Sequence, residues 1–533
     1  MKPLRYLFLS TLLGAYLAAA EVSPVTPEIW KLIAGAHHPD LAQADLADVL
    51  PALSALYHAR QGQPLWLDGE RPTPGAVKAV KVLSAAERVG LAPDRYEAGR
   101  WGTRFRELRS GDPAAAARFD VALSTTLARY ARDVHEGRVA PAEVDFDLGL
   151  PPPKLDLAAV LAAVAVSPTL EADLGALEPP FAAYRDLRAA LPRMRELAAL
   201  PFAPLPEVEK LEAGQPYAES DRLAERLELF GDLEPGLRPE LPPGIYGPEI
   251  ACGVAAFQER HGLLADGIVG ARTWKALNTP PADRVRQIEL SMERWRWLRG
   301  AFSASPIVVN LPEFTLRAMN FHNGDLEPEL TMRVVVGQGV QNETPVFAGR
   351  LQWVVFRPTW SVPTRIAEEE VLPEIDKDPE VVATKGYELI DGTGQVYEAT
   401  PENLEAARAG RLVVRQKAGA KNPLGKVKFL FPNRYDVYLH DSPAKYLFSR
   451  AKRAFSHGCI RVEDPEALAA WVLKDWPKEK IAEALNGDKT LNVPVTATIP
   501  VFILYATAVA RDDGRVAFYE DLYGYDQDLA ELL

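Results

Sequence analysis

Cysteine is scarce in this chain, and lysine and arginine are fewer than aspartate and glutamate. The 533 residues include only Cys252 and Cys459, and the formal net charge is −13. The two cysteines lie far apart and in different predicted domains, so we do not expect a structural disulfide, and at least one thiol is free for another purpose. Because an acidic surface repels phosphate backbones, nucleic acid is excluded as an expected partner.

Long apolar runs are also lacking beyond the first twenty residues. Residues 1–20, MKPLRYLFLSTLLGAYLAAA, place Lys2 and Arg5 ahead of an apolar run that ends in three alanines. This is the three-part layout of a secretory signal, and the run is shorter than the ~20 residues of a comfortable bilayer span. We predict an exported protein that is cleaved after Ala20, with an uncleaved membrane anchor as the alternative.

The remaining composition indicates several folded domains. Hydrophobic residues make up 47% of the chain, and its length suits several domains of ~100–200 residues. Residues 21–200 are rich in Ala, Leu, Arg and Glu, which predicts a helical scaffold domain. One helix face within it is formed by Leu123, Leu127, Tyr130 and Val134.

Proline marks the expected interruptions of this helical region. Breaks are predicted at PPPKLDL, residues 151–157, and around Pro192. The segment PFAPLPEVEKLEAGQPY follows, and residues 201–219 are predicted to be a linker. No metal-ligand spacing accompanies the histidines of this region.

Residues 220–280 predict a small helical module. The stretch VAAFQERHGLLADGIVGARTWKALN, residues 254–278, combines helical spacing of apolar residues with a glycine turn. It resembles the peptidoglycan-binding type 1 module in its FQ pair, its DG-x-x-G turn and its T-x-x-x-L-N ending. A helical spacer between larger domains is the alternative, and Cys252 is expected to be a small buried core thiol.

A connecting helix is predicted at 281–300, and it contains the stretch RQIELSMERWRWL at 286–298. The composition of the chain changes after this helix. Short segments rich in β-branched residues, such as PIVVN, LTMRVVVGQ, GRLQWVVF and YDVYLH, predict a mostly-β catalytic domain over 301–510. Residues 364–421 break this pattern, and we predict that they form an inserted helical cap that acts as a lid. Residues 511–533 form a C-terminal tail, and whether its acidic part, residues 519–533, packs on the catalytic domain or on another protein is left open.

The stretch FSHGCIRVED, residues 455–464, concentrates chemistry around Cys459. A thiol of ordinary pKa (~8.5) is only slightly ionised at neutral pH, so a cysteine nucleophile needs a base. His440 ends a predicted strand, from which its imidazole can be aimed rigidly, and we assign it as general base. The Asp441 region is the nearest acceptor for the other ring nitrogen, through its carboxylate or its carbonyl.

The residues beside Cys459 suit an oxyanion-binding loop. His457 and Gly458 precede the thiol, and glycine permits a sharp turn that presents the amides of Gly458 and Cys459. Arg461 either holds the loop by hydrogen bonds or binds a substrate carboxylate. The plain alternative is a structural cysteine buried beside a turn.

The stretch HDSPAKYLFSRAKRAFSHGCIRV, residues 440–462, resembles the signature of L,D-transpeptidases with a YkuD-type catalytic domain. Similar pieces are VVVGQ, the TP pair at 344–345, RPTWSVP and NPLGKVKF. The order of domains resembles the large periplasmic subgroup of this family, and it implies a multidomain α+β protein. The resemblance assigns Cys459 as nucleophile, His440 as base, and His457 with Gly458 as the loop around the oxyanion.

The resemblance also implies a set of substrate contacts and a reaction. The candidate substrate-binding residues are Tyr438, Arg461, Ser456, Asp441 and Trp360. The implied reaction is acyl transfer through a Cys459 thioester, with release of D-alanine from a tetrapeptide donor and attack by a diaminopimelate-type acceptor amine to give a 3-3 cross-link. Peptidoglycan stem peptides are the implied partners, together with other cell-wall synthesis proteins. No metal or organic cofactor is implied, and carbapenems are expected to acylate the thiol.

Two other kinds of function are retained at this stage. Water attacking the same thioester makes an L,D-carboxypeptidase or an amidase, and the cap is the feature that favours transfer over hydrolysis. A non-catalytic scaffold that binds the wall through residues 220–280 is the second alternative. Periplasmic localisation follows from the predicted signal together with the implied wall substrate.

Overall fold

The structure is a computed structural model that describes residues 23–151, 154–237, 243–339 and 341–533. The predicted secretory signal at residues 1–20 lies outside the described residues. The chain divides into two compact units: the first holds residues 23–85, 92–131 and 156–174, and the second holds residues 86–91, 132–155 and 175–533. None of the described helices combines the length and the apolar content needed to cross a membrane.

The first unit is helical, as the sequence predicts. Its elements are α1 (Thr26–Gly35), α2 (Leu50–Ala59), the hairpin β1 (Leu67–Asp68) and β2 (Arg71–Pro72), α3 (Pro74–Ser84), α4 (Trp101–Glu107), α6 (Leu157–Val166) and the starts of α5 (Pro113–Glu136) and α7 (Leu170–Gly175). Side-chain caps begin two of the helices, since Thr73 accepts a hydrogen bond from the Ala76 amide and Asp156 accepts one from the Ala159 amide.

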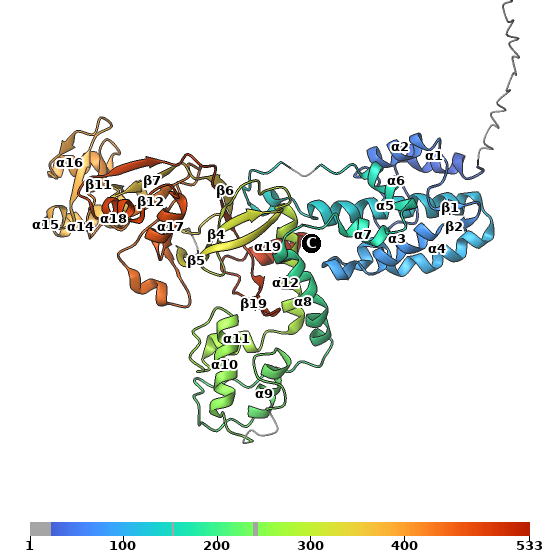
Figure 1. Cartoon of the computed structure of the whole chain (residues 1–533), viewed down its shortest axis with the longest axis horizontal. Coiled ribbons are helices and arrows are strands. Elements are labelled where there is room, and N and C mark those ends of the chain that lie inside the picture. Colours follow the sequence, from blue (N-terminus) through green and yellow to red (C-terminus); the bar gives the residue numbers. More distant parts are fainter. Residues whose placement is uncertain (1–22, 152–153, 238–242, 340) are drawn as a thin grey trace, which may run out of the picture. The chain divides into compact units, whose positions relative to one another are not determined.

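Two predictions about helices have opposite outcomes. The predicted face of α5 is confirmed, because Leu123, Leu127, Tyr130 and Val134 are all buried. The predicted break around Pro192 is wrong, because this proline lies inside α8 (Ala182–Ala198). The helix continues past the missing amide because its apolar face packs against α12 (Pro281–Trp297) in a shared core, and tertiary packing outweighs the cost of one proline. Figure 1 shows α8 and α12 running side by side.

The small module consists of α9 (Ser220–Leu229), α10 (Pro248–Arg260) and α11 (Ala271–Leu277). Gln258, the second residue of the FQ pair, organises the glycine turn from inside. Its amide nitrogen donates to the Ile268 carbonyl (2.8 Å) and to Asp266 Oδ1 (3.1 Å), and its oxygen accepts from the Gly267 amide (2.8 Å). The motif is thus explained by the folding of the module, whose buried turn it satisfies.

Cys252 is exposed on α10, so the prediction of a buried core thiol is wrong. The buried apolar face of α10 is formed by Ile250, Gly253, Val254 and Phe257. Gly253 and Val254 follow Ile250, and Phe257 follows them, at intervals of three or four residues, which places position 252 outside the apolar stripe.

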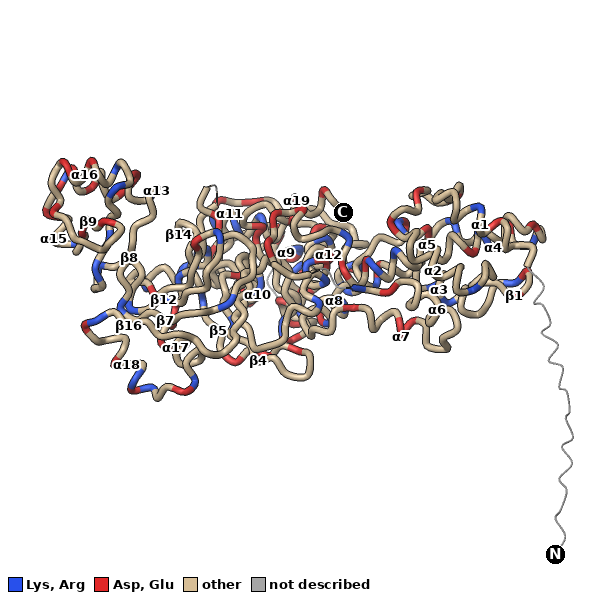
Figure 2. The backbone as a smooth tube through the Cα atoms, turned by 90° about the horizontal axis from the view of Figure 1, so that it is seen from above, with Lys and Arg blue, Asp and Glu red and all other residues tan. Residues whose placement is uncertain are grey.

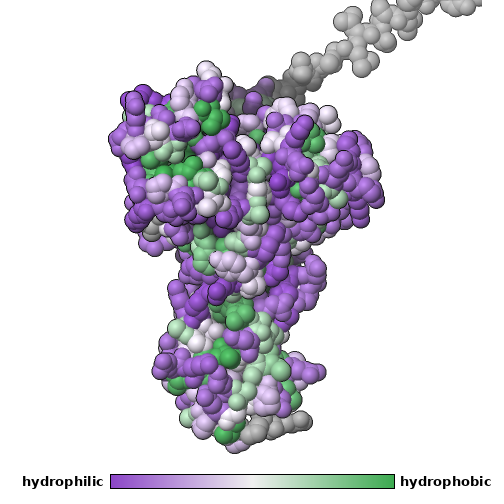
Figure 3. Space-filling view, turned by 90° about the vertical axis from the view of Figure 1, so that its left-hand side faces the viewer, coloured by the Kyte–Doolittle hydropathy of each residue, from purple (hydrophilic) through white to green (hydrophobic). Residues whose placement is uncertain are grey.

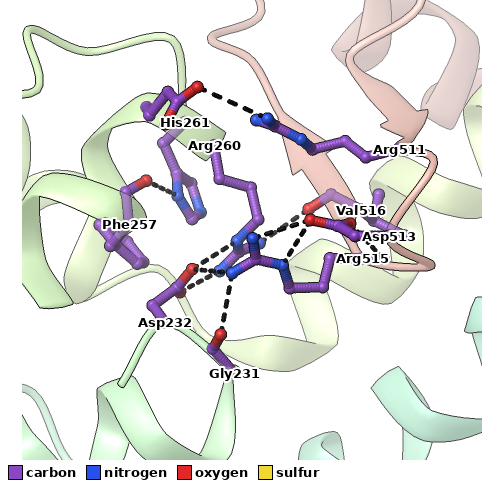
Figure 4. A network of polar contacts seen from close by, with 10 residues as sticks. Gly231, Asp232, Phe257, Arg260, His261, Arg511, Asp513, Arg515 and Val516 are labelled. Carbon is purple, nitrogen blue, oxygen red and sulfur yellow. Dashed lines mark hydrogen bonds and ion pairs between the residues drawn. The ribbon is translucent and has the colours of Figure 1, made fainter. Parts of the chain in front are cut away.

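Buried polar contacts fasten this module to the hairpin of β18 (Ala508–Ala510) and β19 (Val516–Phe518), as Figure 4 shows. Arg260 Nε donates to Asp232 Oδ1 (2.9 Å), and Arg260 also donates to the Val516 carbonyl (2.7 Å). The Arg260 and Asp232 side chains are only 4% and 0% exposed. Arg515 of the hairpin donates in turn to the Gly231 carbonyl (2.8 Å). The module is therefore held by fully partnered charges.

The catalytic region is a mixed 11-stranded sheet with the order β16-β7-β12-β13-β15-β5-β4-β3-β17-β6, in which β14 also pairs with β5. The strands are β3 (Ile307–Asn310), β4 (Thr315–His322), β5 (Asp325–Gly337), β6 (Phe347–Arg350), β7 (Trp353–Phe356), β12 (Val427–Leu430), β13 (Leu439–His440), β14 (Ala454–Ser456), β15 (Ile460–Val462), β16 (Leu491–Pro494) and β17 (Pro500–Leu504). Two helices, α17 (Pro465–Val472) and α18 (Lys478–Asn486), accompany it. The predicted multidomain α+β fold, with a mostly-β catalytic region, is confirmed.

The inserted cap contains a small sheet as well as the predicted helices. Its helical elements are α13 (Thr364–Ile366), η7 (Ala367–Val371), α14 (Leu372–Lys377), α15 (Glu380–Lys385) and α16 (Pro401–Arg408). Its strands, in the order β10-β9-β11-β8, are β10 (Val396–Tyr397), β9 (Tyr387–Ile390), β11 (Val413–Gln416) and β8 (Trp360–Ser361). A core of its own, separate from that of the large sheet, holds the cap together.

The acidic tail packs on the rest of the second unit. The tail ends in α19 (Tyr525–Leu532), which contacts α12, and Arg294 of α12 forms a buried ion pair with Asp526. Tyr523 donates a hydrogen bond to the Gly337 carbonyl at the end of β5 (2.7 Å). The question left open by the sequence is answered for this segment, because it lies against the catalytic sheet.

Charged residues of both signs are interspersed along the chain, as Figure 2 shows. Figure 3 shows one face of the molecule, on which apolar side chains lie in separate patches among polar ones. This pattern is ordinary for a folded protein surface.

Candidate active site

The thiol of Cys459 lies in a three-residue loop between β14 and β15. Both strands pair with β5, and β15 also pairs in parallel with β13. The loop turns at Gly458, whose φ of 115° lies in the left-handed region that favours glycine. The half-buried thiol donates a weak hydrogen bond to the Asp436 carbonyl (3.7 Å). The nucleophile candidate is thus held on a short connection inside the sheet.

Strand register brings three basic side chains onto one face beside this loop. Lys428 of β12 is the cross-strand partner of His440 of β13, and His440 is the partner of Arg461 of β15. Residues directly opposite each other project to the same face of a sheet. We call Lys428, His440 and Arg461 the cross-strand row. Tyr438 lies two residues before His440, and their rings are 5.7 Å apart.

His440 is buried and oriented by the main chain. Its Nδ1 lies 2.6 Å from the Asp441 carbonyl oxygen. A carbonyl only accepts hydrogen bonds, so Nδ1 carries the proton and Nε2 is left with its lone pair. Burial, followed by the charge of Arg461, lowers the pKa of His440 to about 4. The imidazole is therefore neutral at physiological pH, as a general base requires.

The thiol is protonated in the resting site. Burial raises the pKa of Cys459, while hydrogen bonding from Tyr438 and the charge of Arg461 oppose that rise. Burial and the neighbouring thiol raise the pKa of Tyr438, so its phenol stays protonated. A neutral thiol beside a neutral imidazole is the arrangement in which proton transfer accompanies attack on a substrate.

The carboxylate of Asp441 is directed away from the expected substrate position. It accepts hydrogen bonds from the amides of Lys426 (2.8 Å) and Ser442 (2.7 Å) and from Lys445 Nζ (2.8 Å). The prediction of Asp441 as a substrate contact is therefore not supported by this geometry. Its carbonyl orients His440, and its carboxylate fixes the turn that follows.

The loop amides differ from the expectation of a two-donor oxyanion hole. The Gly458 amide donates to Ser456 Oγ (3.2 Å), and Ser456 Oγ donates to the Cys459 carbonyl (2.5 Å). Ser456 is buried and braces the loop, so its hydroxyl is already occupied instead of facing a substrate. Among the described residues, the Cys459 amide donates to no acceptor, and it remains as the oxyanion donor of the pair.

Thr344 and Tyr523 support the loop from behind, and neither role was expected from the sequence. Thr344 Oγ1 donates to the Gly458 carbonyl (2.7 Å) and accepts from the Gly337 amide (2.9 Å). The Tyr523 hydroxyl accepts from the Thr344 amide (3.3 Å) and donates to the Gly337 carbonyl. Thr344 is fully buried. The TP pair was noted in the sequence, but only the fold connects it to Gly458.

His457 faces the cap. Its Nε2 lies 2.8 Å from Glu370 Oε1 in η7, and both side chains are exposed. Arg365 of α13 also contacts Asn342 in the segment after β5. Trp360 lies in β8, where it packs against the cap core, and none of its described contacts reaches Cys459. His457 and Trp360 thus belong to the surroundings of the site, whereas Cys459, His440, Tyr438 and Arg461 are brought together.

Among the described residues, no group of three or more His, Cys, Asp or Glu side chains is arranged to hold a metal ion. What the site offers is a thiol, an oriented base, a phenol, a free amide and two cations. Such a set can perform nucleophilic acyl transfer.

Comparison with known proteins agrees with this chemistry. Residues 305–501 match the family model described as "L,D-transpeptidase catalytic domain", residues 51–191 match "Scaffold domain", and residues 220–277 match "Putative peptidoglycan binding domain". A curated Haemophilus influenzae protein named "Putative L,D-transpeptidase" is 36% identical over 231 residues, which cover 42% of this chain and 46% of that protein. The match thus spans about half the length of the relative.

The family resemblance inferred from the motif around Cys459 is confirmed by the match over the catalytic region, and the order of the three matched regions agrees with it. The chain thus carries an L,D-transpeptidase catalytic domain of the YkuD type over residues 305–501, together with a scaffold domain and a peptidoglycan-binding module.

Proposed function

We propose that this chain is a peptidoglycan L,D-transpeptidase that forms 3-3 cross-links between stem peptides. The observation that carries the proposal is the oriented pair of Cys459 and His440. The imidazole donates a hydrogen bond from Nδ1 to a carbonyl, which leaves Nε2 as an acceptor, and strand register places His440 opposite Arg461, two residues after the thiol. Catalysis is assigned to these two residues, with Tyr438 and the Cys459 amide as hydrogen-bond donors to the reacting atoms.

The first step forms a thioester. His440 Nε2 takes the thiol proton while Cys459 Sγ attacks the carbonyl carbon between the third stem residue and the terminal D-alanine. The Cys459 amide donates to the oxyanion that develops on that carbonyl oxygen. The carbon–nitrogen bond then breaks, His440 returns the proton to the leaving nitrogen, and D-alanine departs.

The second step forms the cross-link. The side-chain amine of a third residue on a neighbouring stem, of the diaminopimelate type, attacks the thioester carbonyl and gives a proton to His440. The carbon–sulfur bond breaks, an amide forms, and the thiolate recovers its proton from His440. The chemistry balances with these groups alone and calls for no metal or organic cofactor.

The cap favours transfer over hydrolysis. It is anchored to the catalytic loop by His457 and Glu370, and a covered thioester is less accessible to water. The same thioester attacked by water would make the enzyme an L,D-carboxypeptidase, and attack on an existing cross-link would make it an amidase. We also expect carbapenems, which are acyl donors, to acylate Cys459.

The assignments of partner and location follow from the domains. Peptidoglycan is the proposed ligand of the module at 220–280, and wall-synthesis proteins are proposed partners. The substrate lies outside the cytoplasmic membrane, so we propose a periplasmic protein exported by the signal at 1–20. We keep the proposed division into a scaffold (21–200), linker (201–219), module (220–280), connecting helix (281–300), catalytic domain (301–510, with the cap at 364–421) and tail (511–533).

Mass spectrometry of products from a purified disaccharide-tetrapeptide tests the proposal. A dimer that has lost one D-alanine, with a fragment joining the two third residues, is expected from the wild-type protein and not from Cys459→Ala or His440→Ala. Tripeptide without dimer would indicate the carboxypeptidase alternative. No product from folded protein would favour the non-catalytic scaffold.

A further inference from the structure

Two cations beside the catalytic pair have no anionic partner in the part of the chain that the structure describes. Lys428 and Arg461 flank His440 in the cross-strand row, and both are half-buried. Among the described residues, neither side chain forms an ion pair, and Arg461 Nε is buried without a hydrogen-bond acceptor. The Lys428 ammonium lies 5.6 Å from the centre of the Tyr438 ring, which is its closest recorded partner. Neighbouring basic residues behave differently, since Lys445 binds Asp441 and Arg453 donates to main-chain carbonyls.

Unpaired cations in a partly buried site are costly, so their retention calls for a ligand. Removing a charge from water without a partner destabilises the folded protein. Burial lowers the pKa of Lys428, and the nearby Cys459 opposes this shift. Burial likewise lowers the pKa of Arg461. An anion arriving between these residues would satisfy both groups.

The proposed reaction delivers an anion to this place. His440 must reach the leaving nitrogen of the donor in order to protonate it. In a terminal amino acid, that nitrogen and the carboxylate are attached to the same carbon, so the carboxylate lies within one residue length, about 3.8 Å, of the nitrogen. The groups next to His440 in the row are Lys428 on one side and Arg461 on the other. The carboxylate therefore arrives among these cations.

We propose that Lys428 and Arg461 form a subsite for the free carboxylate of the departing terminal residue. The inference rests on the proposed function and adds a substrate specificity to it. The enzyme should select donors in which the residue that leaves is the last one and has a free carboxylate. A donor capped as an amide, or extended by a further residue, has no carboxylate at that position. Lysine serves here as a point charge, and arginine as a planar group with several donors.

Paired donors measure this selectivity directly. Tetrapeptide donors with a free C-terminal acid or a C-terminal amide are compared by kcat/KM for release of the terminal residue. We expect the wild-type protein to prefer the acid by about 10- to 100-fold, the range of one or two charge-assisted hydrogen bonds. Lys428→Gln and Arg461→Gln should each reduce this ratio, and Lys428→Arg should restore most of it.

Lys426→Gln is the matched control for the donor comparison. Lys426 directly precedes β12, but its ammonium donates to Asn486 at the end of α18 (2.7 Å). Its substitution should leave the acid-to-amide ratio unchanged. An unchanged ratio in Lys428→Gln and Arg461→Gln, or equal use of both donors by the wild type, would overturn the inference while leaving transpeptidation itself intact.

Alkylation of Cys459 tests the same subsite without any turnover, in a Cys252→Ser background. Iodoacetate and iodoacetamide both react with the thiolate, and they differ in charge. The ratio of their rates therefore isolates the attraction of an anion. We expect Lys428→Gln to lower the iodoacetate-to-iodoacetamide ratio several-fold, and Lys426→Gln to leave it unchanged. Equal ratios in the wild type and Lys428→Gln, with normal iodoacetamide reactivity as proof of an intact site, would refute the carboxylate subsite even if no donor is turned over.

Discussion

The buried polar side chains that the structure describes in the peptidoglycan-binding module all have hydrogen-bond partners, whereas beside Cys459 the buried Arg461 Nε has none. In the module, Gln258 uses both ends of its amide inside the glycine turn, and Arg260 is paired with Asp232 and a carbonyl. Beside Cys459, neither Lys428 nor Arg461 forms an ion pair among the described residues, and the recorded partner of Lys428 is the Tyr438 ring. In the module, folding alone supplies the hydrogen-bond partners of the buried polar groups. Beside Cys459, the cations lack partners that a bound substrate can supply.

Buried charges therefore have two different roles in this molecule, one in stability and one in the active site. Asp232 and Arg260 hold the module to the β18–β19 hairpin, so their substitution should lower the free energy of unfolding (Figure 4). His440 and Arg461 contribute to the electrostatics of the active site, so their substitution should lower the reaction rate and change the selectivity between donors. The following experiments are ordered from the largest expected effect to the smallest.

Removal of the catalytic pair gives the largest expected effect. We expect Cys459→Ala to reduce cross-linking to background and His440→Ala to reduce it by about 10²–10⁴-fold, the usual contribution of a general base. Cys252→Ala is the matched control, because Cys252 is exposed on α10, and it should leave the rate unchanged. Measurable dimer from Cys459→Ala would contradict the assignment of the nucleophile.

Breaking the charge pair of the module tests the structural half of the comparison. Asp232→Ala leaves Arg260 buried without its counter-ion and should reduce the free energy of unfolding of the module by about 3–5 kcal/mol. Hydrogen exchange of the amides in α10 and β19 reports this loss. Asp513→Ala removes the exposed partner of Arg515 and should have an effect of at most about 1 kcal/mol. Equal effects of the two substitutions would show that the buried pair is not the fastening.

Thr344→Val loosens the catalytic loop without touching the reacting groups. The substitution removes the donor to the Gly458 carbonyl and the acceptor for the Gly337 amide. We expect kcat to fall by about 10- to 100-fold with little change in KM, because a misplaced nucleophile lowers the rate of a bound substrate. Thr344→Ser keeps the hydroxyl and should recover most of kcat. A fall in KM alone, or no rescue by serine, would argue against a positioning role.

The pH dependence of kcat/KM tests the electrostatics of the active site. The pKa of His440 is lowered from the usual 6.5 to about 4, so kcat/KM should stay near its plateau at pH 5.5, where an ordinary histidine would lose about tenfold. Arg461→Gln removes a neighbouring charge and should move this acid limb upward. A limb near pH 6.5 in the wild-type protein would contradict the electrostatic account.

The same shift makes a prediction for stability. Between about pH 6.5 and 4 the unfolded chain binds a proton at this histidine, whereas the folded chain does not. The folded state should therefore lose stability as the pH falls through this window, and His440→Gln should flatten that part of the curve of unfolding free energy against pH. This readout depends on the burial of the group and needs no substrate.

The contact between the loop and the cap should have the smallest effect. His457 and Glu370 are 36% and 52% exposed, and such pairs are worth about 0–1 kcal/mol. Glu370→Gln should change kcat/KM by less than about fivefold, while raising the ratio of tripeptide to dimer because the cap opens more often. Abolished cross-linking in Glu370→Gln would assign a larger role to His457 than the structure supports.

The parts of the site that could be predicted are contiguous in the sequence or lie at the end of a recognisable strand. Cys459, His457 and Gly458 occupy one loop, and His440 ends the alternating segment YDVYLH. Lys428 could not be assigned in the same way, because only the register of β12 against β13 places it beside His440. Thr344 and Tyr523 likewise meet Gly458 through the fold, across large separations in the chain.

Errors in the sequence analysis arose where tertiary context overrides a local rule. Pro192 was expected to end a helix, yet the packing of α8 on α12 carries the helix through it. Cys252 was expected in a core because it occupies a position where an apolar helix residue was expected, yet it is exposed on α10. The Gly458 amide was expected to face an oxyanion, yet it donates a hydrogen bond to the nearby Ser456 hydroxyl.

The contact of Tyr523 with the catalytic loop has a consequence for the time at which the enzyme becomes competent. During synthesis a chain folds from its N-terminal side, so Cys459 and His440 emerge well before Tyr523. Until Tyr523 binds Thr344 and Gly337, the hydrogen bonds that support the Gly458 loop from behind are not all formed. The thiol would thus acquire its full reactivity only after the catalytic sheet and the β18–β19 hairpin have been synthesised.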